Sequence, residues 1–288
     1  MENRSNRDNN LDKLDLKPAV DFVAEHVNIY KNGLANFLVN QTKEGIGLAK
    51  RVKFSGQIIG PQIGHDDVKS ILSAMPASLA KLSKLQSVNY ISGVPVPHYD
   101  ADGNFMGTAD WVNPDEFPRK EDHPSRILVG LSDGKNIYPT PIPETVSKNA
   151  RAVGLYQAHV FLHEFFHTVE FSRRSTDRRN NVVFERGDIF TLEDFWNQFS
   201  ELYAKQDRRF VSRYAATYSD KLNETTRENA PDKYEHALAE QMCESFVGYA
   251  LGIISNDRGI TDFRKGHPEE YMLMDRLCKA RVVAKGAD

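Results

Sequence analysis

Three side chains that bind metals or transfer protons stand together in the pentapeptide HEFFH, residues 163–167. On an α-helix, residues four apart lie on one face, so the imidazoles of His163 and His167 can reach a single metal ion. Glu164 is then placed to take a proton from a water molecule that this metal activates. The pattern predicts a zinc site that performs hydrolysis, with Glu164 as the general base.

The residues around this pentapeptide predict a buried helix. Its apolar neighbours are Val160, Phe161, Leu162, Phe165, Phe166 and Val169. A helix that is apolar nearly all round lies in the interior, where two imidazoles and a carboxylate need polar partners or a metal ion. We expect this helix to cover about residues 150–172, after Pro141 and Pro143.

A second helix supplies the missing ligand. A catalytic zinc ion takes three protein ligands, so one must come from elsewhere in the chain. In the largely apolar segment 234–252, Glu240 and Glu244 share one helix face. We expect Glu240 to coordinate the zinc ion and Glu244 to accept a hydrogen bond from a ligand histidine.

Two neighbouring residues receive no role at this stage. His159, His163 and His167 cannot all bind one ion, because the outer two are about 12 Å apart along the helix axis. We therefore expect His159 to be a core or rim histidine. We place Cys243 on another helix face from the two glutamates, as a small buried apolar residue.

These segments resemble the catalytic domain of anthrax lethal factor and its relatives among the gluzincins. The resemblance is carried by HEFFHTVE at 163–170, SRYAAT at 212–217 and EQMCESF at 240–246. It implies that the zinc ligands are His163, His167 and Glu240 and that Glu164 is the base. It also implies that Tyr214 donates a hydrogen bond to the developing oxyanion.

The tyrosine assignment has alternatives. The chain carries an insertion at 219–236, between Tyr214 and Glu240, that departs from the pattern of the group. Tyr218 or Tyr234 could therefore take the role of Tyr214.

The resemblance extends upstream of the metal-binding helix, to GTADW at 107–111 and RILVG at 126–130. It implies an edge strand that pairs with an extended substrate. The residues of that strand are Ile127, Leu128, Val129 and Gly130.

The remaining patterns predict an α+β fold. We expect helices at 17–39, 66–85 (broken at Pro76), 191–206 (opened by the capping pair Thr191 and Asp194), 232–254 and after Pro268, strands at 51–60, 87–94 and 126–131, and a turn-rich loop from Pro95 to Ser125. Together these elements predict a two-lobe zincin. Residues 1–15 form a disordered polar tail, 16–172 an upper lobe with a small mixed sheet and the HEFFH helix, and 173–288 a mainly helical lower lobe that carries Glu240.

The composition excludes several partners. The 288 residues carry a net charge of −3, which gives no reason to expect nucleic acid or an anionic membrane as a partner. No apolar run approaches the roughly 18 residues of a membrane span, and no secretory signal peptide is visible. We expect synthesis in the cytoplasm, and export without a cleaved signal peptide stays open. A local basic patch follows the HEFFH helix, which we place on a solvated face and which could also favour acidic substrate stretches. Its residues are Arg173, Arg174, Arg178, Arg179 and Arg186.

Taken together, the motif and the resemblance predict a zinc-dependent endopeptidase with a narrow set of protein substrates, of the toxin or effector kind. One alternative is a zinc amidase that acts on a non-protein amide. The deformylase branch of such enzymes takes a cysteine upstream of HExxH as its third ligand, whereas Cys243 and Cys278 both lie downstream. Another alternative is a catalytically inactive zincin fold that serves as a binding module.

Overall fold

The structure is a computed structural model that describes residues 16–58, 62–91, 94–99, 105–112, 132–142, 147–174, 183–185, 189–205, 211–212, 215, 231–256 and 259–283. Several predicted features lie outside these residues. They are the polar tail at 1–15, the edge strand Ile127, Leu128, Val129 and Gly130, and the tyrosines Tyr214 and Tyr218.

Helices predominate in the described residues, and short strands accompany them, which confirms a mixed α and β fold. The helices are α1 (Leu16–Glu25), α2 (Val27–Leu38), α3 (Lys43–Arg51), α4 (His65–Ser73), α5 (Ala77–Leu82), α6 (Ala150–Arg174), α7 (Leu192–Lys205), α9 (Pro231–Leu251), α10 (Phe263–Gly266) and α11 (Pro268–Lys279). Helix α3 was not predicted. The predicted helix at 17–39 is two helices, and Pro76 separates α4 from α5 as expected.

Three parallel strands make the sheet next to α6, in the order β1 (Lys53–Ser55), β2 (Ser87–Asn89) and β5 (Asn136–Ile137). We predicted a mixed sheet. The described strands of this sheet pair only in parallel, and the predicted strand at 126–131 lies outside the described residues. One isolated antiparallel bridge joins Ser132 to Ile137 at the β5 edge.

The remaining strands form small antiparallel units. They are the hairpin of β3 (Val94–Tyr99) and β4 (Phe105–Val112), the hairpin of β8 (Ile253–Asn256) and β9 (Gly259–Asp262), and the sheet of β10 (Val282–Val283), β6 (Val183–Glu185) and β7 (Ile189–Thr191). The β3–β4 hairpin corrects our prediction of a loop from Pro95 onward. Prolines are tolerated there because a two-stranded unit leaves half of its backbone groups unpaired, and the register shifts beside Pro97.

Capping side chains define where α6 and α7 begin. The backbone N–H of Ala152 donates to Oδ1 of Asn149 at 3.1 Å, which caps α6. At the start of α7, Oγ1 of Thr191 accepts from the N–H of Asp194, and Oδ2 of Asp194 accepts from the N–H of Thr191. This reciprocal pair confirms the predicted capping box.

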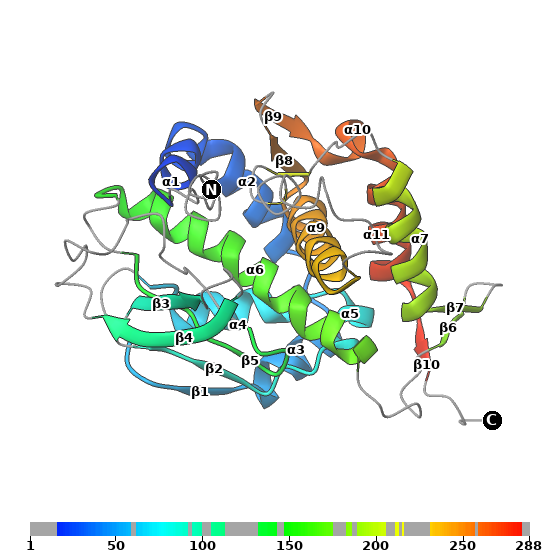
Figure 1. The fold of residues 1–288 in the computed structure, drawn as a ribbon, viewed down its shortest axis with the longest axis horizontal. Helices are drawn as coiled ribbons and strands as arrows, with labels where there is room; N and C mark the ends of the chain where they lie inside the picture. Colours follow the sequence, from blue (N-terminus) through cyan, green and yellow to red (C-terminus); the bar gives the residue numbers. More distant parts are fainter. Residues whose placement is uncertain are drawn as a thin grey trace, which may run out of the picture.

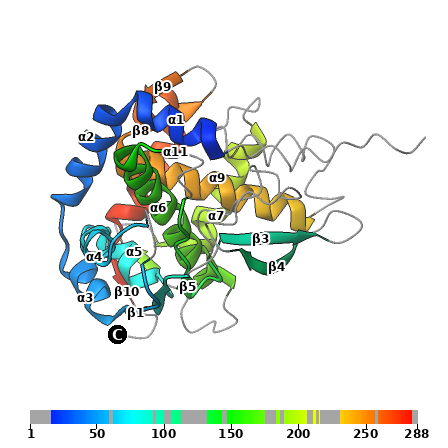
Figure 2. The same cartoon turned by 90° about the vertical axis from the view of Figure 1, so that its left-hand side faces the viewer.

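Helix α6 runs through the middle of the molecule (Figure 1). It contacts β5, α4 and α5 on the side of the sheet, and it contacts α9 on the other side. Figure 2 shows α9 passing beside α6 with α7 next to it. A single buried hydrophobic cluster runs from Val20 of α1 to Cys278 of α11, so residues of both predicted lobes share one core.

Aromatic packing fixes α6 against α9. The rings of Phe165 and Phe166, between the two histidines of HEFFH, lie 6.3 and 5.3 Å from the ring of Phe246 on α9. All three side chains are almost fully buried. The two phenylalanines of the motif therefore hold α6 against α9, and the same helix carries the two histidines and the glutamate of the motif.

Two glycines allow other segments to pack closely against α9 and α6. A Cβ at Gly33 of α2 would lie 2.3 Å from the carbonyl oxygen of Leu251, so α2 packs tightly on the end of α9. A Cβ at Gly134, where φ is +83°, would lie 2.3 Å from the ring of Phe171 on α6. No helix in the described part of the chain is long and apolar enough to span a membrane.

Candidate metal centre

The carboxylate of Glu240 on α9 lies against both imidazoles of the HEFFH motif. Its Oε2 is 3.0 Å from Nε2 of His163, and its Oε1 is 3.4 Å from Nε2 of His167. The two imidazole rings lie 5.0 Å apart, edge to face. The structure thus brings together the three side chains that we predicted as zinc ligands. They come from two helices, and His163 and Glu240 are 77 residues apart in sequence.

A second carboxylate lies behind the first histidine. Oε1 of Glu244 accepts a hydrogen bond from Nδ1 of His163 at 2.7 Å, which is the contact we predicted. The same oxygen also lies 3.3 Å from Nε2 of His159. His159 is therefore a partner of the site and not only a core or rim histidine. We missed this because its contact depends on which face of α6 meets α9.

Charge and burial act in opposite directions on these groups. Burial would lower the pKa of His163, but its hydrogen bonds to Glu240 and Glu244 raise it well above the ordinary value. Burial would raise the pKa of Glu240, but His167 and His163 hold it well below its usual range. Burial would likewise raise the pKa of Glu244, but His159 and His163 lower it. The cluster is thus a set of buried carboxylates held ionised by imidazoles.

These donors fit a zinc ion. With bonds of about 2.0–2.2 Å, a tetrahedral zinc site separates neighbouring ligand atoms by about 3.3–3.6 Å. Glu240 approaches the two Nε2 atoms through different oxygens. Oε2 lies 3.0 Å from His163, which is a direct hydrogen bond and shorter than this value, and Oε1 lies 3.4 Å from His167, which falls within it. The donor chemistry, two imidazoles and one carboxylate, is also that of three-ligand zinc sites with an open position.

Cys243 lies closer to the site than we predicted. Its Sγ and one nitrogen each of His163 and His167 all lie within 4.8 Å of one another. We placed the thiol on another helix face, but residues three apart on a helix are neighbours, and Cys243 is three residues from Glu240. The thiol and the Glu240 carboxylate thus both qualify as the third ligand. Glu240 is favoured because it contacts both imidazoles, whereas burial raises the pKa of the Cys243 thiol well above its ordinary value.

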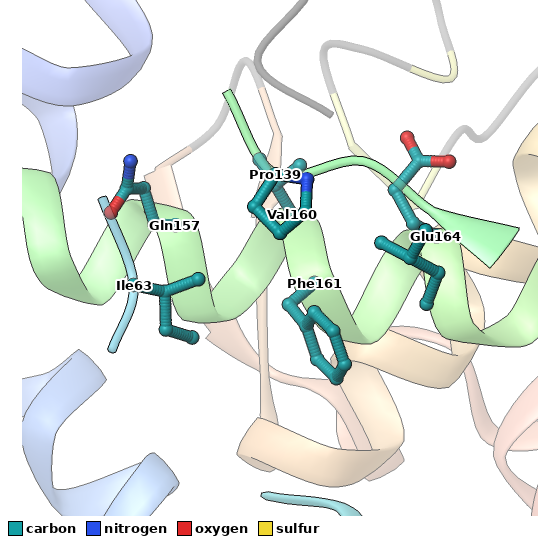
Figure 3. A pocket seen from close by; sticks show the side chains of 7 residues that line it. Ile63, Pro139, Gln157, Val160, Phe161 and Glu164 are labelled. Atoms are coloured by element: carbon teal, nitrogen blue, oxygen red, sulfur yellow. The ribbon is translucent and has the colours of Figure 1, made fainter. Parts of the chain in front are cut away.

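Glu164 lies on the face of α6 that adjoins the sheet (Figure 3). It borders a small hollow lined by Ile63, Ile137, Pro139, Gln157, Val160 and Phe161. Burial raises the pKa of its carboxyl group, although the imidazoles of His167 and His163 oppose this. A carboxylate with a raised pKa is a stronger base, as a proton acceptor in hydrolysis needs to be.

His236 and Tyr234, both on α9, make contacts near the site. The Nε2 atom of the exposed His236 lies 3.9 Å from Oε1 of Glu240, one turn along α9. The hydroxyl of Tyr234 lies 3.0 Å from Oγ of Ser200 on α7 and 3.3 Å from the Ser200 carbonyl. Tyr234 is therefore engaged with α7 in this structure.

Arg173 is not part of a solvated basic face. Its guanidinium lies 3.4 Å from Glu235 on α9, 3.5 Å from Glu193 on α7, and 3.8 Å from the centre of the Trp196 ring. It also lies 3.8 Å from Glu170, the buried acid three residues after HEFFH. Arg173 therefore ties α6 to the two helices beside it, which our prediction missed.

Comparisons of this chain with protein-family models, curated proteins and solved structures find no match.

Proposed function

We propose that this protein is a zinc-dependent endopeptidase of the gluzincin kind, with His163, His167 and Glu240 as ligands. The observation that carries the proposal is the position of the Glu240 carboxylate, at 3.0 and 3.4 Å from the Nε2 atoms of the two histidines. Three buried or nearly buried donors from two helices lie within hydrogen-bond or ion-pair distance of one another through Glu240, and the proposed base Glu164 follows the first of them in sequence.

When bound, zinc would lower the pKa of a water molecule at its open position and polarise the substrate carbonyl. Glu164 would take a proton and deliver it to the leaving amine. Glu244 would fix the tautomer of His163 by accepting its Nδ1–H, so that the lone pair of Nε2 faces the ligand position. Tyr214 is the proposed donor to the oxyanion, and Tyr218 is its alternative, because the Tyr234 hydroxyl is engaged with Ser200.

The proposed fold is a two-lobe zincin with an upper lobe at 16–172 and a lower lobe at 173–288. The position of α6 between the sheet and α9 supports it. The proposed substrate-binding edge strand, Ile127 to Gly130, precedes Ser132, which forms an antiparallel bridge to Ile137 of β5.

The proposed substrates are peptide bonds in a narrow set of proteins, and the toxin or effector role rests on the sequence resemblance alone. A zinc amidase that acts on a non-protein amide would use the same residues. A peptide-library digest with and without a chelator separates these functions. Chelator-sensitive cleavage by the wild-type protein, absent in Glu164→Ala, supports the peptidase. No cleavage by zinc-loaded protein contradicts it.

The position of Cys243 favours a second candidate, a catalytically inactive metal-binding module. If the thiolate joined the two histidines and Glu240, the zinc ion would have four protein ligands, which is typical of structural sites. Replacement of zinc by cobalt tests this directly, because a thiolate ligand gives an intense charge-transfer absorption in the near ultraviolet. Its presence in the wild type and its loss in Cys243→Ala would favour the module over the peptidase.

A further inference from the structure

One oxygen of Glu244 is shared between two histidines of α6. Oε1 lies 2.7 Å from Nδ1 of His163 and 3.3 Å from Nε2 of His159. An ionised carboxylate only accepts hydrogen bonds, so both imidazole nitrogens must be donors there. The Nε2–H of His159 therefore fixes its neutral tautomer with the lone pair on Nδ1.

That lone pair has no partner among the described residues. Nδ1 of His159 is buried and accepts no hydrogen bond. The ring itself is held in place, since it lies 5.9 Å from the ring of Tyr156 and 6.4 Å from the ring of Tyr30. A buried acceptor without a donor is costly, by about 1–3 kcal/mol, so a donor is expected at this point.

A cavity adjoins the same ring. Its volume is about 20 Å³, enough for one water molecule. Its walls come from α2, α6, α9, the start of β8 and the segment at 211–212, and they include His159, Glu244 and the two hydroxyl-bearing residues Tyr30 and Ser212. A buried water molecule needs two to four polar partners, and these side chains supply them.

We propose that His159 is a positioning residue of the metal site, held by a buried water molecule in this cavity. The water donates to Nδ1 of His159, the Nε2–H of His159 donates to Glu244, and Glu244 accepts from His163 and so orients that ligand. This inference rests on the proposed zinc site. Ser212, which lines the cavity, lies two residues before Tyr214 in sequence.

Three substitutions of His159 separate this role from simple packing. His159→Phe fills the space but removes both nitrogens. His159→Gln can place its amide N–H near the Nε2 position and keep the bond to Glu244. His159→Asn places its amide near the Nδ1 position and loses that bond. Zinc dissociation constants are measured by competition with a chromophoric chelator.

We expect His159→Phe and His159→Asn to weaken zinc binding by roughly 10-fold, the lower end of the range for residues that support a ligand. His159→Gln should bind zinc within about threefold of the wild type. Equal affinities for all four proteins would overturn the proposal. So would equal weakening in all three variants, because a packing role does not distinguish Gln from Phe.

A metal-free measurement keeps this test separate from the proposed function. In ¹⁵N spectra of the apoprotein, the Nδ1 resonance of His163 should shift in His159→Phe and return toward its wild-type position in His159→Gln. An unchanged His163 resonance in His159→Phe contradicts the positioning role, whether or not the protein binds zinc. A crystal structure should show a water molecule within about 3.2 Å of Nδ1 of His159. A direct contact from Tyr30 or Ser212 with no water would overturn that part.

Discussion

Nδ1 of His163 lies 2.7 Å from Oε1 of Glu244, on the opposite side of the ring from Glu240. The His163 ring is thus held by Glu244 at Nδ1, while its Nε2 faces Glu240. This contact separates the two acids of α9 by role, since Glu240 meets both imidazoles through Nε2 and Glu244 meets His163 through Nδ1. Substitutions of the two acids should therefore have different effects.

Glu244→Ala should weaken zinc binding without abolishing it. The supporting partner of a ligand histidine is typically worth 10–100-fold in metal affinity. Glu244→Gln retains an oxygen that can accept from His163 and should fall between Ala and wild type. Competition with a chromophoric chelator gives the affinities. A Glu244→Ala protein that binds zinc like the wild type would show that this contact does not orient the ligand.

Glu240→Ala should lose zinc more completely, because it removes a ligand. We expect a loss of more than about 100-fold, beyond the range for supporting residues. The matched control is Cys243→Ala, three residues along the same helix and equally buried. It should keep its zinc content in elemental analysis. Full zinc occupancy in Glu240→Ala with loss in Cys243→Ala would transfer the third ligand to the thiol.

Glu164→Gln should keep zinc and lose hydrolysis. The side chain borders the hollow on α6 and is not one of the three proposed ligands, so the metal content should not change. Loss of a general base typically costs about 10²–10⁴ in rate. Cleavage of a fluorogenic peptide, measured on protein of verified zinc content, gives the comparison. Unchanged cleavage would remove Glu164 from the mechanism.

Much of this arrangement could be predicted from sequence because it depends on local spacing. Helix α6 is apolar nearly all round, and Thr191 with Asp194 forms a capping pair whose geometry is local. The partners of His159 and Arg173 could not be predicted, because they lie on other helices and depend on tertiary packing. Cys243 is buried as predicted, but its thiol lies near the two histidines because residues three apart on a helix are neighbours, and Cys243 is three residues from Glu240.

Gly33→Ala should destabilise the protein and disturb the site from a distance. The new methyl group would meet the carbonyl oxygen of Leu251 at 2.3 Å, so α2 or the end of α9 must move. Overpacking of this kind costs about 1–3 kcal/mol.

Gly47→Ala on α3 is the control, because nothing lies within 4 Å of its Cβ and alanine is the better helix former. Thermal unfolding should show a lower Tm for Gly33→Ala and an equal or higher Tm for Gly47→Ala. Equal melting temperatures for Gly33→Ala and wild type would mean that the α2–α9 contact is looser than the structure has it.

Removal of the metal should lower the melting temperature without unfolding the protein. Phe165, Phe166 and Phe246 hold α6 against α9 through contacts that need no ion, and the imidazoles and carboxylates satisfy one another in its absence. A ligand at 100 times its dissociation constant stabilises the folded state by about 2.7 kcal/mol. Addition of zinc should therefore raise the Tm of the apoprotein by several degrees. The shift should vanish in Glu240→Ala and persist in Glu164→Gln. A chelator that unfolds the wild type at room temperature would show instead that the ion is needed to build the α6–α9 core.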